Sequence, residues 1–215
     1  MAALGLVGVV VLIVIVGVVA KGMRQGYEQT LQQLGQPFGW SYERTRGRGL
    51  QAAVGVGHVL RGWVDGRAFE LVVAPEGRNK YLSERWSIRL AGALPGGFAA
   101  GKNGLLRGTS AGMVKIASGD PEFDKKVLCE GVDPAQAWLV ISAEPRKAVL
   151  RELAAMDAVV FGNTIVFAKT GFDTKLAKLQ ARLDKLRRFA AALDPVQPQA
   201  YYAPPPGPPP PWPAG

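Results

Sequence analysis

The sequence has very few of the side chains that hold metals or form disulfides. Its 215 residues include one cysteine, Cys129, and one histidine, His58. A single thiol cannot form an intramolecular disulfide, so nothing in the chain requires an oxidising compartment. One Cys and one His also cannot supply the ligands of a Cys/His zinc site. The sequence therefore predicts no metal and no cofactor.

Acidic side chains are scarce as well. There are 17 Asp and Glu residues against 26 Lys and Arg residues, which gives a net charge of +9. A cationic domain suits the anionic surface of a membrane, and the same charge would suit nucleic acid. Charge alone leaves both partners open.

The first long stretch of the chain lacks polar side chains altogether. Residues 2–20 carry no charge, and as a helix they would span about 28 Å, close to the hydrocarbon thickness of a bilayer. A cleaved signal peptide is the alternative, because Val18-Val19-Ala20 could serve as a cleavage site. However, no Lys or Arg precedes the apolar run, as a signal peptide would require. We therefore predict a single-pass membrane anchor.

Basic residues follow this stretch directly and indicate its orientation. Positively charged flanks stay on the cytoplasmic side, so the rest of the chain is expected in the cytosol, with an anionic inner leaflet as partner. The predicted contacts with anionic lipid are Lys21, Arg24, Arg44, Arg46 and Arg48.

The remaining chain divides into three parts. Residues 21–37 read as a juxtamembrane helix or linker, 38–193 as one soluble domain, and 194–215 as a disordered proline-rich tail. In the domain, Asp65-Gly66 and Gly162-Asn163 predict two tight hairpins. Asp120-Pro121 and Asp133-Pro134 predict helix starts, since Asp caps a helix and Pro suits its first position.

These elements define the expected fold class. We predict an α+β fold: one N-terminal transmembrane helix, then a soluble domain with an antiparallel sheet and helices collected in its second half, then the tail. A strand over residues 81–90 is expected to be half-buried, because Trp86, Ile88 and Leu90 alternate with Arg85 and Arg89.

The last predicted helix carries a regular apolar stripe. Its leucines recur at a four-then-three spacing, typical of an amphipathic or coiled-coil helix. The stripe can pack on the sheet, mediate self-association or lie on a membrane surface. The residues that would mediate self-association are Leu176, Leu179, Leu183 and Leu186.

The tail is dominated by proline. Residues 204–213 read PPPGPPPPWP, which favours polyproline II and cannot build a core. Such a segment is either a passive extension or a peptide that docks in an aromatic groove. The predicted docking residues are Tyr201, Tyr202, Pro208, Pro209, Pro210 and Trp212.

Three motifs match known sites incompletely. Residues 96–103 fit the spacing of a phosphate-binding loop, but Asn103 replaces the Ser or Thr that holds magnesium. Ser110 lies in a Gly-x-Ser-x-Gly sequence, yet a strand rather than a helix is expected after it. Asp120, Glu122 and Asp124 alternate like calcium ligands but lack the glycine and glutamate that complete the loop. No catalytic, cofactor-binding or metal-binding residue is assigned.

One longer pattern resembles a family. Residues 118–124 read SGDPEFD, followed by a short expected strand and Asp133-Pro134-Ala135. This resembles the centre of uncharacterised bacterial single-pass membrane-anchored proteins with a Gly-Asp-Pro-x-Phe-Asp segment. The resemblance spans roughly residues 65–193, including the Leu-Pro-Gly-Gly turn at 94–97. It implies a membrane-tethered α+β domain in the bacterial inner membrane, with no assigned catalytic residue.

Three functions remain open from sequence. The leading one is a non-catalytic interaction or scaffold module with a basic cytosolic domain and a docking tail. A membrane-bound hydrolase could use Ser110, or an acid pair of Asp120 and Asp124, if these converge with His58 or with each other. A nucleic-acid-binding protein could use the arginines of residues 44–48 with Arg85 and Arg89, interleaved with Trp40 and Trp86.

Overall fold

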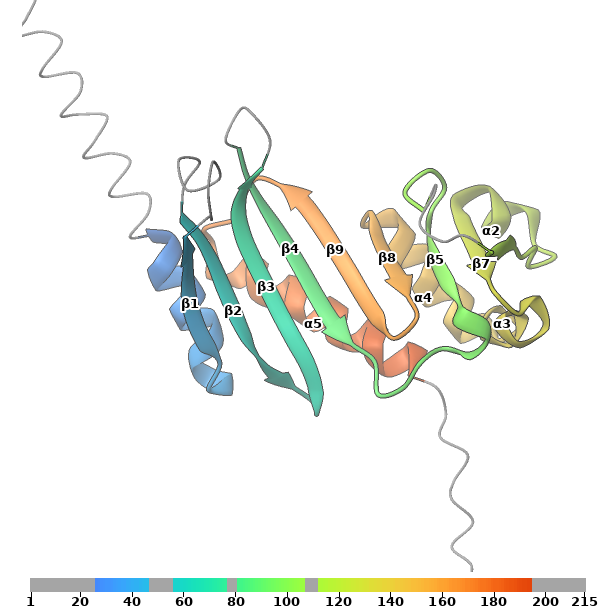
Figure 1. Ribbon diagram of the computed structural model, residues 1–215, viewed down its shortest axis with the longest axis horizontal. Coiled ribbons are helices and arrows are strands. Elements are labelled where there is room, and N and C mark those ends of the chain that lie inside the picture. Colours follow the sequence, from blue (N-terminus) through green and yellow to red (C-terminus); the bar gives the residue numbers. More distant parts are fainter. Residues whose placement is uncertain (1–25, 47–55, 77–80, 107–111, 195–215) are drawn as a thin grey trace, which may run out of the picture.

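A computed structural model gives the architecture of the chain. It describes residues 26–46, 56–76, 81–106 and 112–194. In this part of the chain the strands form a single nine-stranded sheet, in which all pairs are antiparallel. The strand order is β1-β2-β3-β4-β9-β8-β5-β7-β6, and Figure 1 shows the sheet running across the whole molecule. The strands are β1 Ser41–Arg46, β2 Val56–Val64, β3 Arg67–Glu76, β4 Tyr81–Arg89, β5 Ala99–Lys102, β6 Val114–Lys115, β7 Val127–Gly131, β8 Ala158–Phe161 and β9 Thr164–Thr170.

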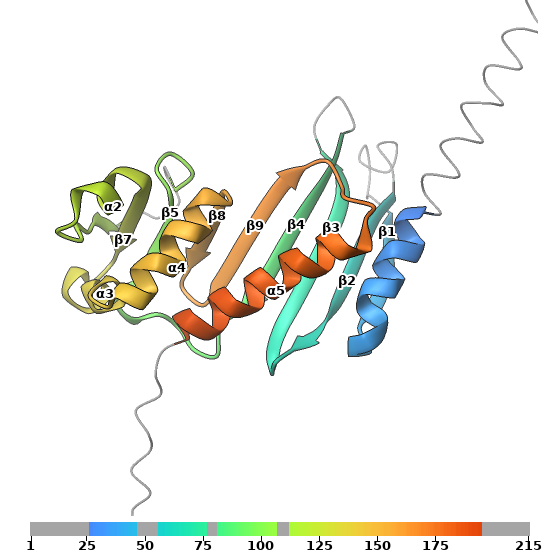
Figure 2. The ribbon, with the colours of Figure 1, turned by 180° about the vertical axis from the view of Figure 1, so that it is seen from behind.

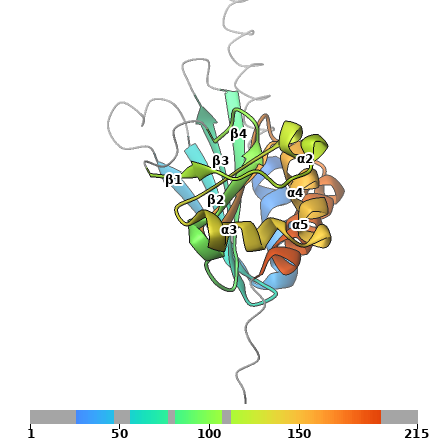
Figure 3. The ribbon, with the colours of Figure 1, turned by 90° about the vertical axis from the view of Figure 1, so that its right-hand side faces the viewer.

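The helices lie on one side of this sheet. Figure 2 shows α5, α4 and the helix of residues 26–35 in front of the strands, and Figure 3 shows the same two layers from the side. The other described helices are α2 Pro121–Lys126, α3 Pro134–Ile141, α4 Glu144–Ala155 and α5 Leu176–Leu193, with short 3₁₀ turns at Gln36–Phe38 and Pro95–Gly97. None of the described helices lies on the opposite face of the long strands β1 to β4 and β9 (Figure 1).

The two predicted hairpins are confirmed. Asp65 and Gly66 join β2 to β3 with φ angles of 49° and 72°, the left-handed values that a two-residue hairpin turn requires. Gly162 and Asn163 join β8 to β9 by a turn in which only Gly162, at the first central position, has a left-handed φ, of 58°. Asp and Gly tolerate these angles better than bulkier residues do, which explains the strength of both signals.

Both predicted helix starts are also confirmed. The Asp120 carboxylate accepts hydrogen bonds from the backbone N–H groups of Glu122 and Phe123, and so caps α2. Asp133 caps α3 through the N–H groups of Ala135 and Gln136. In each helix proline occupies the first position, where its missing N–H costs nothing.

The core lies between the sheet and the helices. The leucine stripe of α5 faces the strands, with Leu179, Leu183 and Leu186 buried and Leu176 partly buried against the same cluster. Leu31 and Leu34 of the helix of residues 26–35 are buried in this cluster too. The stripe therefore packs on the sheet, and the alternative prediction of self-association through these leucines is wrong.

The predicted fold class needs correction. The described chain is one nine-stranded antiparallel sheet with helices on one face, the first over residues 26–35 and α2 to α5 in the second half of the chain. Within the described ranges, no helix is both long enough and apolar enough to cross a membrane. Residues 2–20, to which the sequence assigns a transmembrane helix, and residues 195–215 of the tail lie outside the described residues.

Candidate functional site

The helix-free side of the sheet, which we call the open face, presents an unusual mixture of side chains. Strand alternation sends every second residue of β4 to this side, and these are Arg85, Ser87 and Arg89. The register places Ala68 of β3 beside Arg89, and Thr164 of β9 on its other flank. Small residues thus sit between long cationic ones, which leaves the surface uneven.

A groove of about 610 Å³ crosses the open face near one end of the strands. Its most prominent side chain is Trp63, which lies near the hairpin end of β2 and is 68% exposed. Ala68 and Ser87 are short and form a low floor between Trp63 and Arg89. Arg61 and Glu70 form an ion pair across β2 and β3 at 2.6 Å, so that these two charges neutralise each other.

Two cations on the open face have no such neutralising partner. No hydrogen bond or ion pair joins the side chain of Arg85 or Arg89 to any residue that the structure describes. The groove therefore combines an exposed indole with uncompensated positive charge. Aromatic and Arg side chains are the types that most often dominate the energy of protein interfaces.

The covered face of the same strand has the opposite character. Glu84 is fully buried, and its carboxylate is bound by Arg182 of α5, which is only 13% exposed. The Arg182 guanidinium lies between two rings, 5.6 Å from the centre of Trp86 and 5.2 Å from that of Phe167. It also contacts Asp173 at 3.1 Å. This cluster fixes α5 against β4 and β9.

The charges of this cluster perturb one another. Burial raises the pKa of Glu84, and the attraction of Arg182 and Lys169 only partly offsets that effect. Burial also acts against ionised Asp173, but Arg182, Lys169 and Lys178 lower its pKa on balance. One oxygen of Glu84 and the Trp86 indole nitrogen are buried without a hydrogen-bond partner in the described structure. A cleft of about 600 Å³ beside Arg182 is lined by lysines and by Met156 and Phe167.

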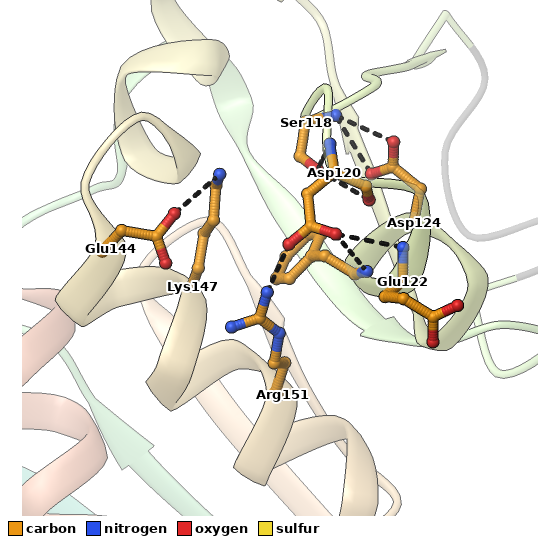
Figure 4. A network of polar contacts seen from close by, with 8 residues as sticks. Ser118, Asp120, Glu122, Asp124, Glu144, Lys147 and Arg151 are labelled. Carbon is orange, nitrogen blue, oxygen red and sulfur yellow. Dashed lines mark hydrogen bonds and ion pairs between the residues drawn. The ribbon is translucent and has the colours of Figure 1, made fainter.

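The two acids proposed for a hydrolase are engaged in local structural contacts. Figure 4 shows Asp120 and Asp124 engaged in local structure: Asp120 caps α2 and pairs with Arg151 of α4, and Asp124 accepts hydrogen bonds from the Ser118 N–H. Hydrogen bonds from the Phe123 N–H, with Arg151 nearby, lower the pKa of Asp120. These acids therefore stabilise the start of α2 and its contact with α4. Ser110 lies outside the described residues.

His58 and Cys129 also have structural roles. His58 is buried on β2, and its Nδ1 lies 2.7 Å from the Tyr42 hydroxyl of β1, at the far end of the sheet from Asp120. Burial raises the pKa of the Cys129 thiol to about 12, so at neutral pH this residue is a thiol and a poor nucleophile.

The residues that resemble a phosphate-binding loop form a packing turn. Gly96 has a φ of 66°, and its carbonyl accepts hydrogen bonds from the N–H groups of Val132 and Asp133. A Cβ on Gly96 would lie 2.4 Å from the Asp133 carbonyl oxygen, so only glycine fits against the start of α3. This contact explains the glycine without a nucleotide.

The predicted basic contacts are divided between different surfaces. Arg44 lies on β1 and pairs with Glu28 of the first helix, and Arg46 ends that strand. Arg85 and Arg89 project from the other side of the sheet, and Trp40 and Trp86 are buried. The surface proposed for nucleic acid is therefore not assembled. The remaining predicted contacts lie outside the described residues, namely Lys21, Arg24, Arg48, Tyr201, Tyr202, Pro208, Pro209, Pro210 and Trp212.

Sequence reasoning missed the two features that distinguish the faces. Neither Trp63 nor Arg182 belongs to a recognisable sequence motif, and from sequence Trp63 is simply one apolar residue before the Asp65-Gly66 turn. The available signal was the alternation of β2, in which Trp63 has the parity of Arg61 and not that of Leu60 and Val64.

Comparison with known proteins gives a fold but no family. No family model matches the chain, and no curated protein matches it. Among solved structures, the fold is similar to that of the mycobacterial trehalose monomycolate transport factor A, TtfA, with a TM-score of 0.53 and 14% sequence identity. The match covers 81% of this chain and 99% of that one. The sheet and its helices therefore belong to an architecture also found in a bacterial transport factor.

Proposed function

We propose that this protein is a non-catalytic factor in lipid transport, which acts by binding a protein of the transport machinery through its open face. The observation that carries the proposal is the fold, which is shared with TtfA over 99% of that chain. Because 14% identity supports similarity of fold alone, the role in lipid transport is an inference. A place at the inner membrane, next to such machinery, is part of the same proposal.

The surface of the domain supports a binding role. The described helices all lie on one side of the sheet, and Trp63 is exposed on the open face. The side chains of Arg85 and Arg89 form no ion pair with any described residue, because the nearby Glu70 is paired with Arg61, so they are available to acids of a partner. We therefore expect the partner to present carboxylates beside an apolar patch that receives the indole.

The test is site-specific photocrosslinking in membranes of the source organism. A crosslinking residue at position 63 should capture a membrane-transport protein, and the same residue at position 188, on the exposed side of α5, should not. Arg89→Ala should reduce that capture at least about tenfold, the effect of removing one interfacial charge pair, and Arg188→Ala should leave it unchanged.

The proposal has two ways to fail. Equal capture from positions 63 and 188 would show that the open face has no special role. Capture of only proteins unrelated to transport, with lipid export unchanged in cells lacking the protein, would remove the role in transport.

A further inference from the structure

We propose that the proline-rich tail of the chain, residues 201–213, docks in the groove around Trp63 of its own domain. The docking itself goes beyond the proposed function, and only its consequence for partner binding rests on that function. Four observations on the described residues support it: where the tail begins, how far it reaches, which hydrogen-bonding groups the groove offers, and which apolar surface it exposes.

Asp194, the last described residue, lies near one end of the groove, on the covered side of the sheet. It is bound by Arg67, whose side chain strand alternation sends to the covered side, and it accepts a 2.8 Å hydrogen bond from the backbone N–H of Ala91. Arg67 immediately precedes Ala68, which lines the groove, and Ala91 lies two residues after Arg89. A segment that continues from Asp194 therefore has a short path to the groove around the ends of β3 and β4.

The tail is long enough to enter it. Nine residues lie between Asp194 and Pro204, and in a polyproline II conformation the ten steps from one to the other would extend about 31 Å. The groove runs across β1, β2, β3, β4 and β9, whose spacing of about 4.8 Å gives a width of about 19 Å. The proline run can therefore pass around the strand ends and still cover the full width.

The hydrogen-bonding groups of the two surfaces are complementary. Proline has no N–H, so a proline run offers carbonyl acceptors and almost no donors. The groove offers donors: the Trp63 indole N–H, the Ser87 hydroxyl and the Arg89 guanidinium have no partner in the described part of the chain. Its one carboxylate, Glu70, is already paired with Arg61. Such a groove binds an acceptor-rich segment better than a donor-rich one.

The apolar surfaces also match. Proline rings pack well on an exposed indole, which is how aromatic grooves bind polyproline II segments. Trp63 is 68% exposed, and Ala68 leaves space beside it for a ring. Because tail and groove belong to one chain, their effective concentration is in the millimolar range, so an intrinsic dissociation constant of about 0.1 mM would populate the docked state about tenfold over the undocked one.

The consequence concerns regulation. The docked tail would cover the same Trp63 and Arg89 that the proposed function assigns to the transport partner. The partner must then displace the tail, so that binding is weakened by the population of the docked state, about tenfold on the estimate above.

The experiment measures hydrogen exchange of the Trp63 indole N–H by NMR in the full chain, with the resonance assigned through Trp63→Phe. A variant with Pro208, Pro209, Pro210 and Trp212 replaced by serine should exchange this proton about tenfold faster. A matched control with Gln197 and Gln199 replaced by serine changes the tail outside its proline run, and should exchange at the original rate.

Two outcomes of this experiment would overturn the proposal. Equal exchange in both variants would show that the groove is empty. Protection that disappears on dilution would assign the groove to the tail of a second copy. Because the readout contains no partner, it is independent of the photocrosslinking result, and either proposal can fail alone.

Discussion

Strand β4 contributes side chains of opposite character to the two faces of the sheet. On the covered face, β4 contributes Glu84 and Trp86, which are buried with Arg182 beneath α5. On the open face it contributes Arg85 and Arg89, whose charges are left to solvent. An arginine in the first setting must be paired because it has lost its water, whereas an arginine in the second costs little and remains free to bind. The comparison predicts that equal substitutions on the two faces have very unequal effects.

The largest effect is expected for Arg182→Ala. Removing this guanidinium leaves Glu84 buried without its partner, which should lower the free energy of unfolding by about 3–5 kcal/mol at pH 7. Chemical denaturation measures the loss. Arg89→Ala on the same strand is the matched control, and equal losses in the two variants would refute the distinction between the faces.

The loss should also depend on pH. Burial raises the pKa of Glu84, so the folded state holds this proton more tightly than the unfolded state does. Stability from this group is therefore full below the ordinary carboxyl pKa of 4.5 and declines as pH rises through the folded value. Without Arg182 the folded pKa is higher still, so the variant should lose less stability, relative to the original protein, at pH 4.5 than at pH 7.

A slightly smaller effect is expected for Leu183→Ala. This leucine is buried between α5 and the sheet, so truncation should cost about 3 kcal/mol and leave the oligomeric state unchanged. Denaturation and light scattering measure the two quantities, with exposed Lys185→Ala as control. A change in oligomeric state with little loss of stability would mean that the leucine stripe serves self-association after all.

A cap substitution should have a moderate effect. Asp133→Ala removes both side-chain hydrogen bonds at the start of α3 and should cost about 1 kcal/mol, while Asp133→Asn keeps an acceptor and should cost much less. Thermal denaturation distinguishes them. Equal losses in the two variants would show that charge, and not the cap, is what stabilises this end.

The smallest effect on stability is expected on the open face. Arg85→Ala and Arg89→Ala should change the free energy of unfolding by no more than about 0.5 kcal/mol, because neither side chain has a partner among the described residues. Chemical denaturation again provides the measurement. If either substitution lowered the free energy of unfolding by 2 kcal/mol or more, roughly the cost of losing a buried contact, that arginine would stabilise the fold as Arg182 does.

Local features of the fold were predictable from sequence, and long-range ones were not. Asp65-Gly66 and Asp133-Pro134 act through neighbouring backbone groups, so their patterns were sufficient. The pairing of β4 with β9 joins Arg89 to Thr164, and no local pattern indicates which distant strand will complete a sheet. The same limit hid the buried ion pair of the covered face, because Glu84 and Arg182 are 98 residues apart in the sequence and only the packing of α5 on β4 brings them together.

The β4–β9 pairing also has a consequence for synthesis on the ribosome. The first four strands form a meander, but the partner of β4 begins at Thr164, about 75 residues after β4 ends. At a translation rate of about 5–20 residues per second, the edge of β4 and the apolar face of the sheet stay uncovered for several seconds before β9 and α5 are synthesised. During that interval the nascent chain exposes an unpaired strand edge, so we expect it to depend on chaperones until its last helix is made.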